Sequence, residues 1–337
     1  MRMSRLFFAG AGALIAIAAA HAAFANDSSA EKAAGGLVLR QNRDIDMVSE
    51  DLFVSPAQVR VRYVFRNRAA QPQRITVAFP MPDRDLSYEM ESEVAYPGDF
   101  HTMVDGRPVR MSIERRALLN GVDRTAELVR LRVPISPAPG QRANSLADAI
   151  GRMPRATQQR LASLGLIDAA SLADSSHQIL PMWTVRETWH WDQVFPAGRD
   201  LRVEHRYAPG VGGTAGVPLA NRDFRAGENG REYQRDYCTD AAFLAGIDRM
   251  QARAEQRQAN YPMEQRLRYI LTTGGNWRSP IGDFRMVVDK GSPNAIISFC
   301  GDGVRRISPT QFEVRHRNWR PDRDLAVLIV APIPPQQ

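Results

Sequence analysis

The sequence predicts a mainly β protein with helical insertions, an α+β chain whose strands form antiparallel β-sandwich-like regions. Three observations predict this class. Apolar and polar residues alternate with a period of two between Trp183 and Tyr207, as on a strand with one buried face. The same alternation recurs between Val59 and Phe79. Near residue 144 the apolar spacing becomes helical, and it returns to strand spacing after residue 177.

The first 25 residues have the order of a secretory signal peptide. Two arginines precede an apolar run over residues 6–20, and a small-residue cleavage site ends at Ala25. A membrane anchor fits less well, because this run is shorter than the roughly 20 residues that cross a bilayer. We therefore expect a periplasmic or secreted protein whose mature chain begins at Asn26, with no transmembrane span left after the signal is removed.

The mature chain is expected to begin with a flexible segment, because residues 26–36 are small and polar. A hairpin is predicted from the two alternating runs that flank the polar connection at Asn67 and Pro72. Asp105 and Gly106 are a favoured tight-turn pair and predict a second, shorter hairpin. Together these signals give an N-terminal β-sandwich-like region over residues 26–140. Its strands are expected near residues 37–39, 45–48, 59–66, 75–79, 100–104 and 109–113.

A helical insertion is predicted over residues 141–176. Ser145 can cap a helix that carries Leu146 and Ile150 on one face. Pro154 is suited to the first position of a second helix, and Gly165 is a typical helix stop. The insertion therefore separates two β-rich regions, and we expect two medium-sized domains in a chain of 337 residues.

The C-terminal β-rich region, residues 177–337, opens with the most regular stretch of the chain. Residues 183–209 predict a long antiparallel hairpin that turns at Pro196, Ala197 and Gly198. Its apolar face carries Trp189 and Trp191, and large aromatic side chains usually pack into a core. The alternative is that these two residues, together with Trp183 on the same face, form an exposed platform that binds a sugar or a peptide.

The remaining segments of the C-terminal region give weaker signals. Residues 210–232 are rich in Gly, Asn and Arg and predict a long loop. Helices are expected at about 240–271, the first capped by Thr239 or Asp240 and the second starting at Pro262. Strands are then predicted at 284–288, 295–299, 312–314 and 325–330.

Cys238 and Cys300 are the only two cysteines. In an exported chain an even number of cysteines predicts disulfide bonding, so we expect one bond between them. This pairing also removes the strongest nucleophile from the possible catalytic residues.

His190 and Asp192 lie two residues apart on the polar face of one predicted strand, so both could reach one ion or ligand. A zinc site normally needs three or four protein donors, so neither a metal site nor a cofactor is predicted. His205 falls in an apolar series and is expected to be a hydrogen-bonded core histidine. No nucleophile elbow, phosphate loop, dinucleotide fingerprint or paired metal-ligand spacing occurs in the sequence, and we predict no catalytic residue.

The charge pattern gives no nucleic-acid footprint. The formal net charge is +7, and removal of the leader with Arg2 and Arg5 lowers it to +5. Lys32 and Lys290 are the only lysines, and the arginines are interleaved with acidic residues instead of forming basic blocks.

Several short phrases are spread over most of the chain: Tyr63, Phe65, Asn67, Phe79, Pro80, Pro82, Trp191, Phe195, Pro196, Ala197, Gly198, Val203, His205, Tyr207, Pro209, Thr272, Gly274, Asn276, Trp277, Pro280, Ile281, Phe284, Val288, Asp289, Lys290, Ser298, Phe299 and Cys300. Together they resemble the bacterial secreted family catalogued as domain of unknown function 4424. The resemblance implies a secretion signal and no assigned activity. The run that ends in Phe79, Pro80 and Pro82 is also similar to interaction domains of inter-alpha-trypsin inhibitor heavy chains, which favours binding over catalysis.

The sequence therefore predicts a non-catalytic binding or envelope-associated module, whose partner is an envelope protein or a polysaccharide. The alternative is a hydrolase or metal-dependent enzyme whose site is assembled from distant residues. A deep cleft that gathers His, Asp or Glu would favour the enzyme, and a shallow aromatic surface would favour binding.

Overall fold

The computed structural model describes residues 26–33, 36–89, 100–138, 141, 144–172, 179–214, 216–257 and 261–332. The predicted signal peptide and the last residues of the predicted helical insertion, 173–176, lie outside these ranges. Within them, no helix combines the length and the apolar character that a membrane crossing requires.

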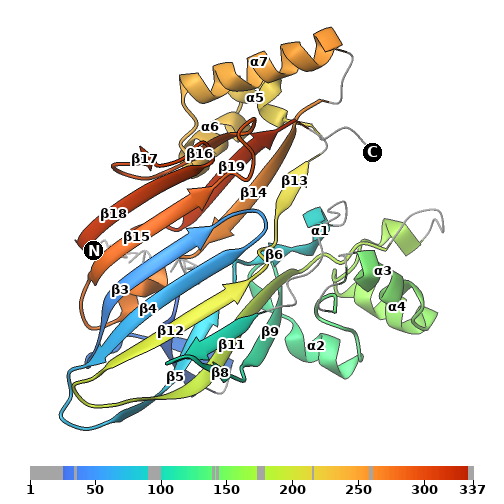
Figure 1. The fold of residues 1–337 in the computed structure, drawn as a ribbon. Coiled ribbons are helices and arrows are strands. Elements are labelled where there is room, and N and C mark those ends of the chain that lie inside the picture. Colours follow the sequence, from blue (N-terminus) through green and yellow to red (C-terminus); the bar gives the residue numbers. More distant parts are fainter. Residues whose placement is uncertain are drawn as a thin grey trace, which may run out of the picture.

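The described strands form three sheets, which confirms the mainly β, α+β prediction (Figure 1). In the first sheet the order is β10-β9-β11-β5-β1-β2, with β6 beside β11; in the second it is β17-β18-β15-β3-β4-β12-β7-β8; in the third it is β13-β14-β19-β16. Neighbouring strands are antiparallel except β3 and β15, which are parallel. The first sheet contains β1 (Ser28–Ala33), β2 (Gly36–Arg40), β5 (Gln73–Pro80), β6 (Arg84–Asp85), β9 (Ser112–Leu119), β10 (Val122–Asp123) and β11 (Thr184–Phe195); the second contains β3 (Ile45–Val54), β4 (Val59–Asn67), β7 (His101–Val104), β8 (Arg107–Val109), β12 (Asp200–Tyr207), β15 (Ile281–Asp289), β17 (Arg305–Arg306) and β18 (Gln311–Trp319); the third contains β13 (Gly212–Thr214), β14 (Met263–Tyr269), β16 (Ile296–Phe299) and β19 (Leu325–Ala331).

The two longest predicted hairpins are wrong in their pairing. β11 pairs with β5 and β9, whereas β12 pairs with β4 and β7. The turn at residues 196–199 therefore crosses from one sheet to the other, and the connection from β4 to β5 does the same. The alternation shows which face of a strand is buried but not which strand lies beside it. Two strands whose apolar faces meet across a sandwich bury both faces, so the same pattern fits this arrangement. The short hairpin of β7 and β8 at Asp105 and Gly106 is confirmed.

Aromatic side chains fill the space between the first two sheets. Ring contacts join Phe65 to Phe195 and Phe79 to Tyr207, each pair bridging the two sheets. The expectation that the Trp183 to Phe195 face packs into a core is confirmed, because its apolar side chains are buried. The third sheet contributes Tyr269 to the same core. Strands from before and after the helical insertion therefore share one interior, and the two predicted β-rich regions do not have separate cores.

Two groups of helices lie at the edges of the sheets (Figure 1). The predicted helical insertion contains α3 and α4, which pack with α2 around Trp183, Leu128 and Leu161. The second group covers the third sheet, against which Phe243 and Ile247 of α7 pack. The described helices are α1 (Leu86–Glu89), α2 (Thr125–Arg130), α3 (Asn144–Gly151), α4 (Arg155–Ser163), α5 (Arg222–Ala226), α6 (Glu228–Tyr237) and α7 (Ala241–Arg257), with short 3-10 turns η1 (Ala170–Leu172), η2 (Pro218–Ala220) and η3 (Thr272–Asn276).

Two predicted elements differ from the structure. The second helix expected within 240–271 is the strand β14, which lies between β13 and β19. Its apolar residues are spaced as on a helix, and such short runs do not distinguish the two states. The expected loop at 210–232 contains β13, α5 and the start of α6, and Asn221 caps α5 by accepting the backbone N–H of Asp223 at 2.8 Å. The helix α7 is as predicted, with Asp240 accepting the N–H of Phe243 at 2.7 Å.

Gly282 in β15 is required by a close approach of two backbones. The register of β3 shifts between Met47 and Ser49, which is a β-bulge. A Cβ on Gly282 would lie 2.5 Å from the carbonyl oxygen of Val48 in that bulge. We expect Gly282→Ala to lower the free energy of unfolding by about 2 kcal/mol, because backbone atoms must move to relieve the clash. Urea unfolding measures this change.

The matched control for Gly282→Ala is Gly151→Ala. A Cβ at Gly151, which ends α3, meets no atom within 4 Å. Alanine is the better helix former, so this variant should be as stable as the wild type or slightly more stable. An unchanged urea midpoint for Gly282→Ala would contradict the expected clash.

Candidate functional site

A groove lies where the ends of β5, β12 and β14 come together. We use "the groove" for two adjoining hollows, of about 370 and 470 Å³, that share Pro82, Asp83 and Arg268. The first is lined by Met81, Pro82, Asp83, Arg84, Asp85, Val185, Glu187, Tyr207, Pro209, Gly210, Val211, Gly212, Gly213, Tyr237, Arg266 and Arg268. The second adds Arg235, Asp236, Tyr269, Ile270, Arg323, Asp324, Leu325 and Ala326.

The segment that follows β12 explains why the groove can form. Pro209 comes two residues after the end of β12, and the chain then continues through Gly210 and Val211 to β13, which begins with Gly212 and Gly213. A Cβ on Gly213 would lie 2.9 Å from the carbonyl oxygen of Glu264 in β14. Only glycine therefore allows this segment to lie so close to β14 and form one wall of the groove.

The carboxylates that line the groove are held by the protein itself. Asp83 accepts two hydrogen bonds from Arg186, at 3.0 and 2.6 Å, and this pairing raises the pKa of Arg186. Glu187, which is nearly fully buried, accepts from Arg115 at 2.7 Å and from the indole N–H of Trp189 at 2.9 Å. These acids consequently act as fixed parts of the wall.

Two arginines of β14 supply the cationic side of the groove. Arg266 and Arg268 are two residues apart on one strand and therefore share a face. Arg266 lies 3.4 Å from Glu264, and Arg268 donates to Asp236 at 3.0 Å. A guanidinium has five N–H donors, so these contacts with described residues leave donors for a ligand.

Two tyrosine rings complete the groove. Tyr207 and Tyr237 are almost fully buried. Burial raises the pKa of both hydroxyls, so both rings stay neutral. The groove thus combines guanidinium groups with neutral aromatic and aliphatic surface.

The predicted pair His190 and Asp192 lies away from the groove. Both stand on the face of β11 opposite to its buried side chains, where Asp192 accepts a hydrogen bond from Thr76 at 2.8 Å. Partial burial lowers the pKa of His190, and the nearby Lys32 lowers it further. Within the described part of the chain no three His, Cys, Asp or Glu residues are placed to hold a metal ion.

The predicted aromatic pair is buried in the core. Trp189 is 9 % exposed and stacks on Phe100 at a ring distance of 4.8 Å. Trp191 is 4 % exposed and donates its indole N–H to Gln193 at 3.1 Å. These two rings therefore do not form an exposed platform, although Trp189 supports Glu187 at the groove.

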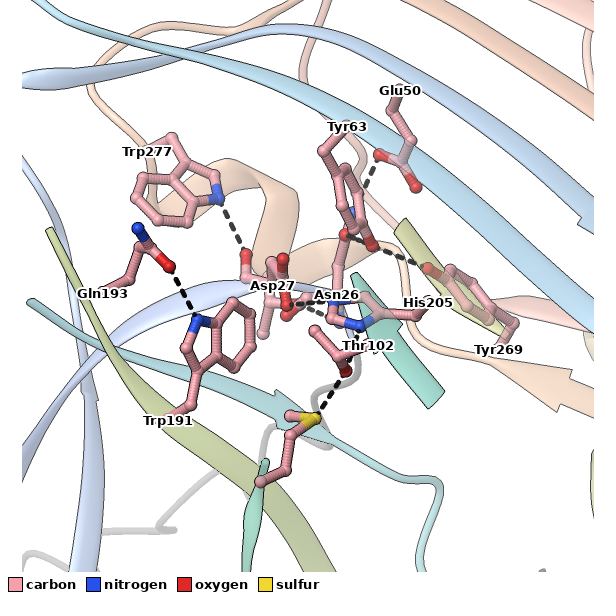
Figure 2. Close-up of polar contacts among 12 residues, drawn as sticks. Asn26, Asp27, Glu50, Tyr63, Thr102, Trp191, Gln193, His205, Tyr269 and Trp277 are labelled. Carbon is pink, nitrogen blue, oxygen red and sulfur yellow. Dashed lines mark hydrogen bonds and ion pairs between the residues drawn. The ribbon is translucent and has the colours of Figure 1, made fainter. Parts of the chain in front are cut away.

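The structure also contains a polar cluster inside the sandwich that the sequence analysis missed (Figure 2). The expectation of a flexible start is wrong for Asn26, Asp27 and Ser28, which are fully buried, and for β1. The side-chain amide of Asn26 donates to Glu50 at 2.9 Å, and its carbonyl accepts from the hydroxyl of Tyr63.

Other strands close this interior cluster. The Tyr269 hydroxyl lies 3.0 Å from that of Tyr63. His205 is the predicted core histidine: its Nε2 lies 3.0 Å from Asp27 and its Nδ1 lies 2.9 Å from Thr102. Glu50 and His205 are polar residues on otherwise apolar strand faces. That is the sequence signal for a buried polar partner, because an unpaired buried polar group is costly.

The two carboxyl groups of the cluster are strongly perturbed. Burial, with the charge of Asp27 adding to it, raises the pKa of Glu50 to about 8. Burial also raises the pKa of Asp27, and His205 opposes that change. One oxygen of each carboxyl group, Oε1 of Glu50 and Oδ2 of Asp27, has no hydrogen-bond partner among the described residues.

The sandwich and its arginine-lined groove define a β-rich protein with a hollowed, cationic surface site. The chain belongs to the family described as domain of unknown function DUF4424, whose sequence model matches residues 25–328. The resemblance seen in the sequence is thereby confirmed. A search of curated proteins finds no match.

Two solved structures are distantly similar to this chain. One is a protein from Legionella pneumophila provisionally described as nutrient binding, with 13% identity and a TM-score of 0.44; the match covers 91% of this chain and 70% of that one. The other is an M1 zinc metallopeptidase from Deinococcus radiodurans, with 11% identity and a TM-score of 0.28; the match covers 86% of this chain and spans only 43% of that longer one. Likenesses this distant carry no activity across, so function is argued from this chain's own residues.

Proposed function

We propose that this protein is an exported, non-catalytic binding module whose groove takes a small organic anion. The ligand carries a carboxylate or phosphate beside an apolar or aromatic portion. The observation that carries the proposal is the placement of Arg266 and Arg268 on one face of β14, in a groove that Tyr207 and Tyr237 also line.

The chemistry of the groove fits this ligand class. Guanidinium groups bind carboxylates and phosphates through paired N–H donors, which gives both strength and orientation. Met81, Val185 and Val211 offer apolar contact next to the two tyrosines. A volume of about 370 Å³ lies within the range of small-molecule sites.

Binding is better supported than hydrolysis. The described residues that line the groove include no Ser, Cys or His, the side chains that most often act as nucleophile and base. Two acids of the wall, Asp83 and Glu187, are already engaged by Arg186 and Arg115. The groove therefore offers groups that can bind a ligand, and its described lining lacks the side chains that most often act as nucleophile and base.

The test is a binding titration of the purified mature protein by calorimetry. Phenyl phosphate and benzoate are the anionic probes, and benzyl alcohol is their uncharged counterpart. We expect the anions to bind and the alcohol to bind at least tenfold more weakly, because a charge-assisted hydrogen bond contributes about 1.5–3 kcal/mol. The double variant Arg266→Gln, Arg268→Gln should lose at least tenfold in affinity for the anions.

The matched control is Arg62→Gln. Arg62 is an exposed arginine of β4 that pairs with Glu204 at 2.8 Å and does not line the groove. This variant should bind the anions as the wild type does. Equal anion affinity in the double variant, or tighter binding of the alcohol, would contradict the proposal.

A further inference from the structure

The interior cluster contains two carboxyl groups without a cationic partner from any lysine or arginine that the structure describes. Glu50 is paired only with the Asn26 amide, and Asp27 only with His205 through its side chain. Each acid keeps one oxygen without a partner. Buried carboxyl groups are normally paired with a cation, so this interior is one positive charge short.

The backbone nitrogen of Asn26 lies inside the same cluster. Its N–H donates to the Thr273 hydroxyl, which in turn donates to the carbonyl oxygen of Asn26. Asn26 has no exposed surface, and the next residue, Asp27, is held by the indole N–H of Trp277 at 2.7 Å. The start of the predicted mature chain is therefore anchored among the two acids (Figure 2).

We propose that the chain is cut immediately before Asn26 and that the released α-ammonium group is the missing cation of this interior cluster. The cut is a hydrolysis by a signal peptidase of the host. Water adds to the carbonyl carbon of Ala25, the bond to the Asn26 nitrogen breaks, and the products are the Ala25 carboxylate and the Asn26 α-ammonium. The inference rests on the exported character of the proposed function and not on the groove.

The Asn26 nitrogen can donate more hydrogen bonds in the cut chain than in the uncut chain. A peptide nitrogen before Asn26 has a single N–H, which Thr273 already accepts. An ammonium has three N–H donors and a full positive charge. The ammonium therefore adds two donors to an interior in which one oxygen of Glu50 and one oxygen of Asp27 have no partner among the described residues.

The uncut chain and the chain cut before Asn26 should differ in how their stability depends on pH. The titratable groups of the interior cluster around Asn26 are Asp27, Glu50 on β3, Tyr63 on β4, His205 on β12 and Tyr269 on β14. Without the ammonium, the pKa of Glu50 is raised to about 8. The folded chain then holds a proton that the unfolded chain has lost, so stability should fall as the pH rises from about 4.5 to about 8.

With the ammonium present, Glu50 is ionised and the amine keeps its proton. A raised amine pKa contributes stability below its unfolded value of about 8, and that stability is lost only at higher pH. The cut chain should therefore keep its stability through neutral pH, where the uncut chain loses it.

The experiment compares two purified chains that differ only at this position. One begins at Asn26 after removal of a fusion partner by a protease that leaves no extra residue, and the other keeps Gly-Ser before Asn26. Intact mass confirms both termini, and the thermal midpoint is measured from pH 5 to pH 9. At pH 7.5 we expect the chain with the free terminus to unfold about 5 °C higher or more.

Glu50→Gln in both chains supplies the control. The variant removes the charge that the ammonium pairs with, so the difference between the two termini should shrink by at least half. If the Gly-Ser chain does not fold, the free-terminus chain and its Glu50→Gln variant still test the inference, because the first should lose clearly more stability than the second as the pH rises above about 8. Equal midpoints and equal pH profiles would overturn it.

A chemical readout checks the position of the amine directly. An aldehyde reagent selective for α-amino groups should label the free-terminus chain slowly when folded and at least tenfold faster in urea. Equal labelling rates would overturn the inference. Protein recovered from the host with another first residue would refute the cut before Asn26, and with it this inference, while leaving the anion titration of the groove unaffected.

Discussion

Trp277→Ala should lower the free energy of unfolding by about 5 kcal/mol. Truncation of a buried tryptophan costs about 3–5 kcal/mol through lost contacts and the cavity left behind. Trp277 is fully buried, with its ring 4.7 Å from that of Phe65. It also donates to the carbonyl oxygen of Asp27 at 2.7 Å, and an orphaned buried acceptor adds about 1 kcal/mol or more.

Urea unfolding followed by fluorescence or circular dichroism measures this loss. Trp277→Phe separates the two contributions, because phenylalanine keeps most of the ring and removes the donor. Trp319→Ala is the matched control: its ring is only half-buried and lies against His316 at the end of β18, so its loss should be clearly smaller. Equal losses for Trp277→Ala and Trp319→Ala would contradict this account of the core.

Loss of the Cys238–Cys300 disulfide should cost about 4 kcal/mol in the chain-entropy account of a loop of this length. The bond joins residues 62 positions apart whose Cα atoms are 5.1 Å apart. It connects the end of α6 to the end of β16, and Cys238 adopts a left-handed backbone conformation there. The bond thus restrains the second group of helices on the third sheet.

The double variant Cys238→Ser, Cys300→Ser should show the loss in urea unfolding without a reductant. Dithiothreitol should lower the midpoint of the wild type to a similar value and leave the double variant unchanged. Thiol counting in denatured, unreduced wild-type protein should find no free thiol. Two reactive thiols in that assay would refute the bond.

The sequence predicted most of the longer strands, their buried faces and the disulfide, because each depends on local spacing or on residue count. It did not predict that β11 and β12 belong to different sheets, since that choice is made by β5 and β4 much earlier in the chain. The two segments would show the same alternation either way. Pairing between distant strands is therefore the part of this fold that one sequence leaves open.

The groove was missed for a related reason. Residues 262–271 were expected to form a helix, and two residues two positions apart on a helix do not share a face. On the strand β14, Arg266 and Arg268 do share one. Because a helical spacing was expected for this one segment, Arg266 and Arg268 were not predicted to lie on the same face.

The buried position of Asn26 has a consequence for the order of assembly. Asn26 and Thr273 are bonded across 247 residues. For a chain that crosses a membrane from its N-terminus, as we propose, the first residues to emerge are among the last to find their partners. They cannot make these contacts until η3, which contains Thr273, has also crossed the membrane. A polar run of Asn, Asp and two Ser is well suited to that interval, because it offers no apolar surface to which another unfolded chain could stick.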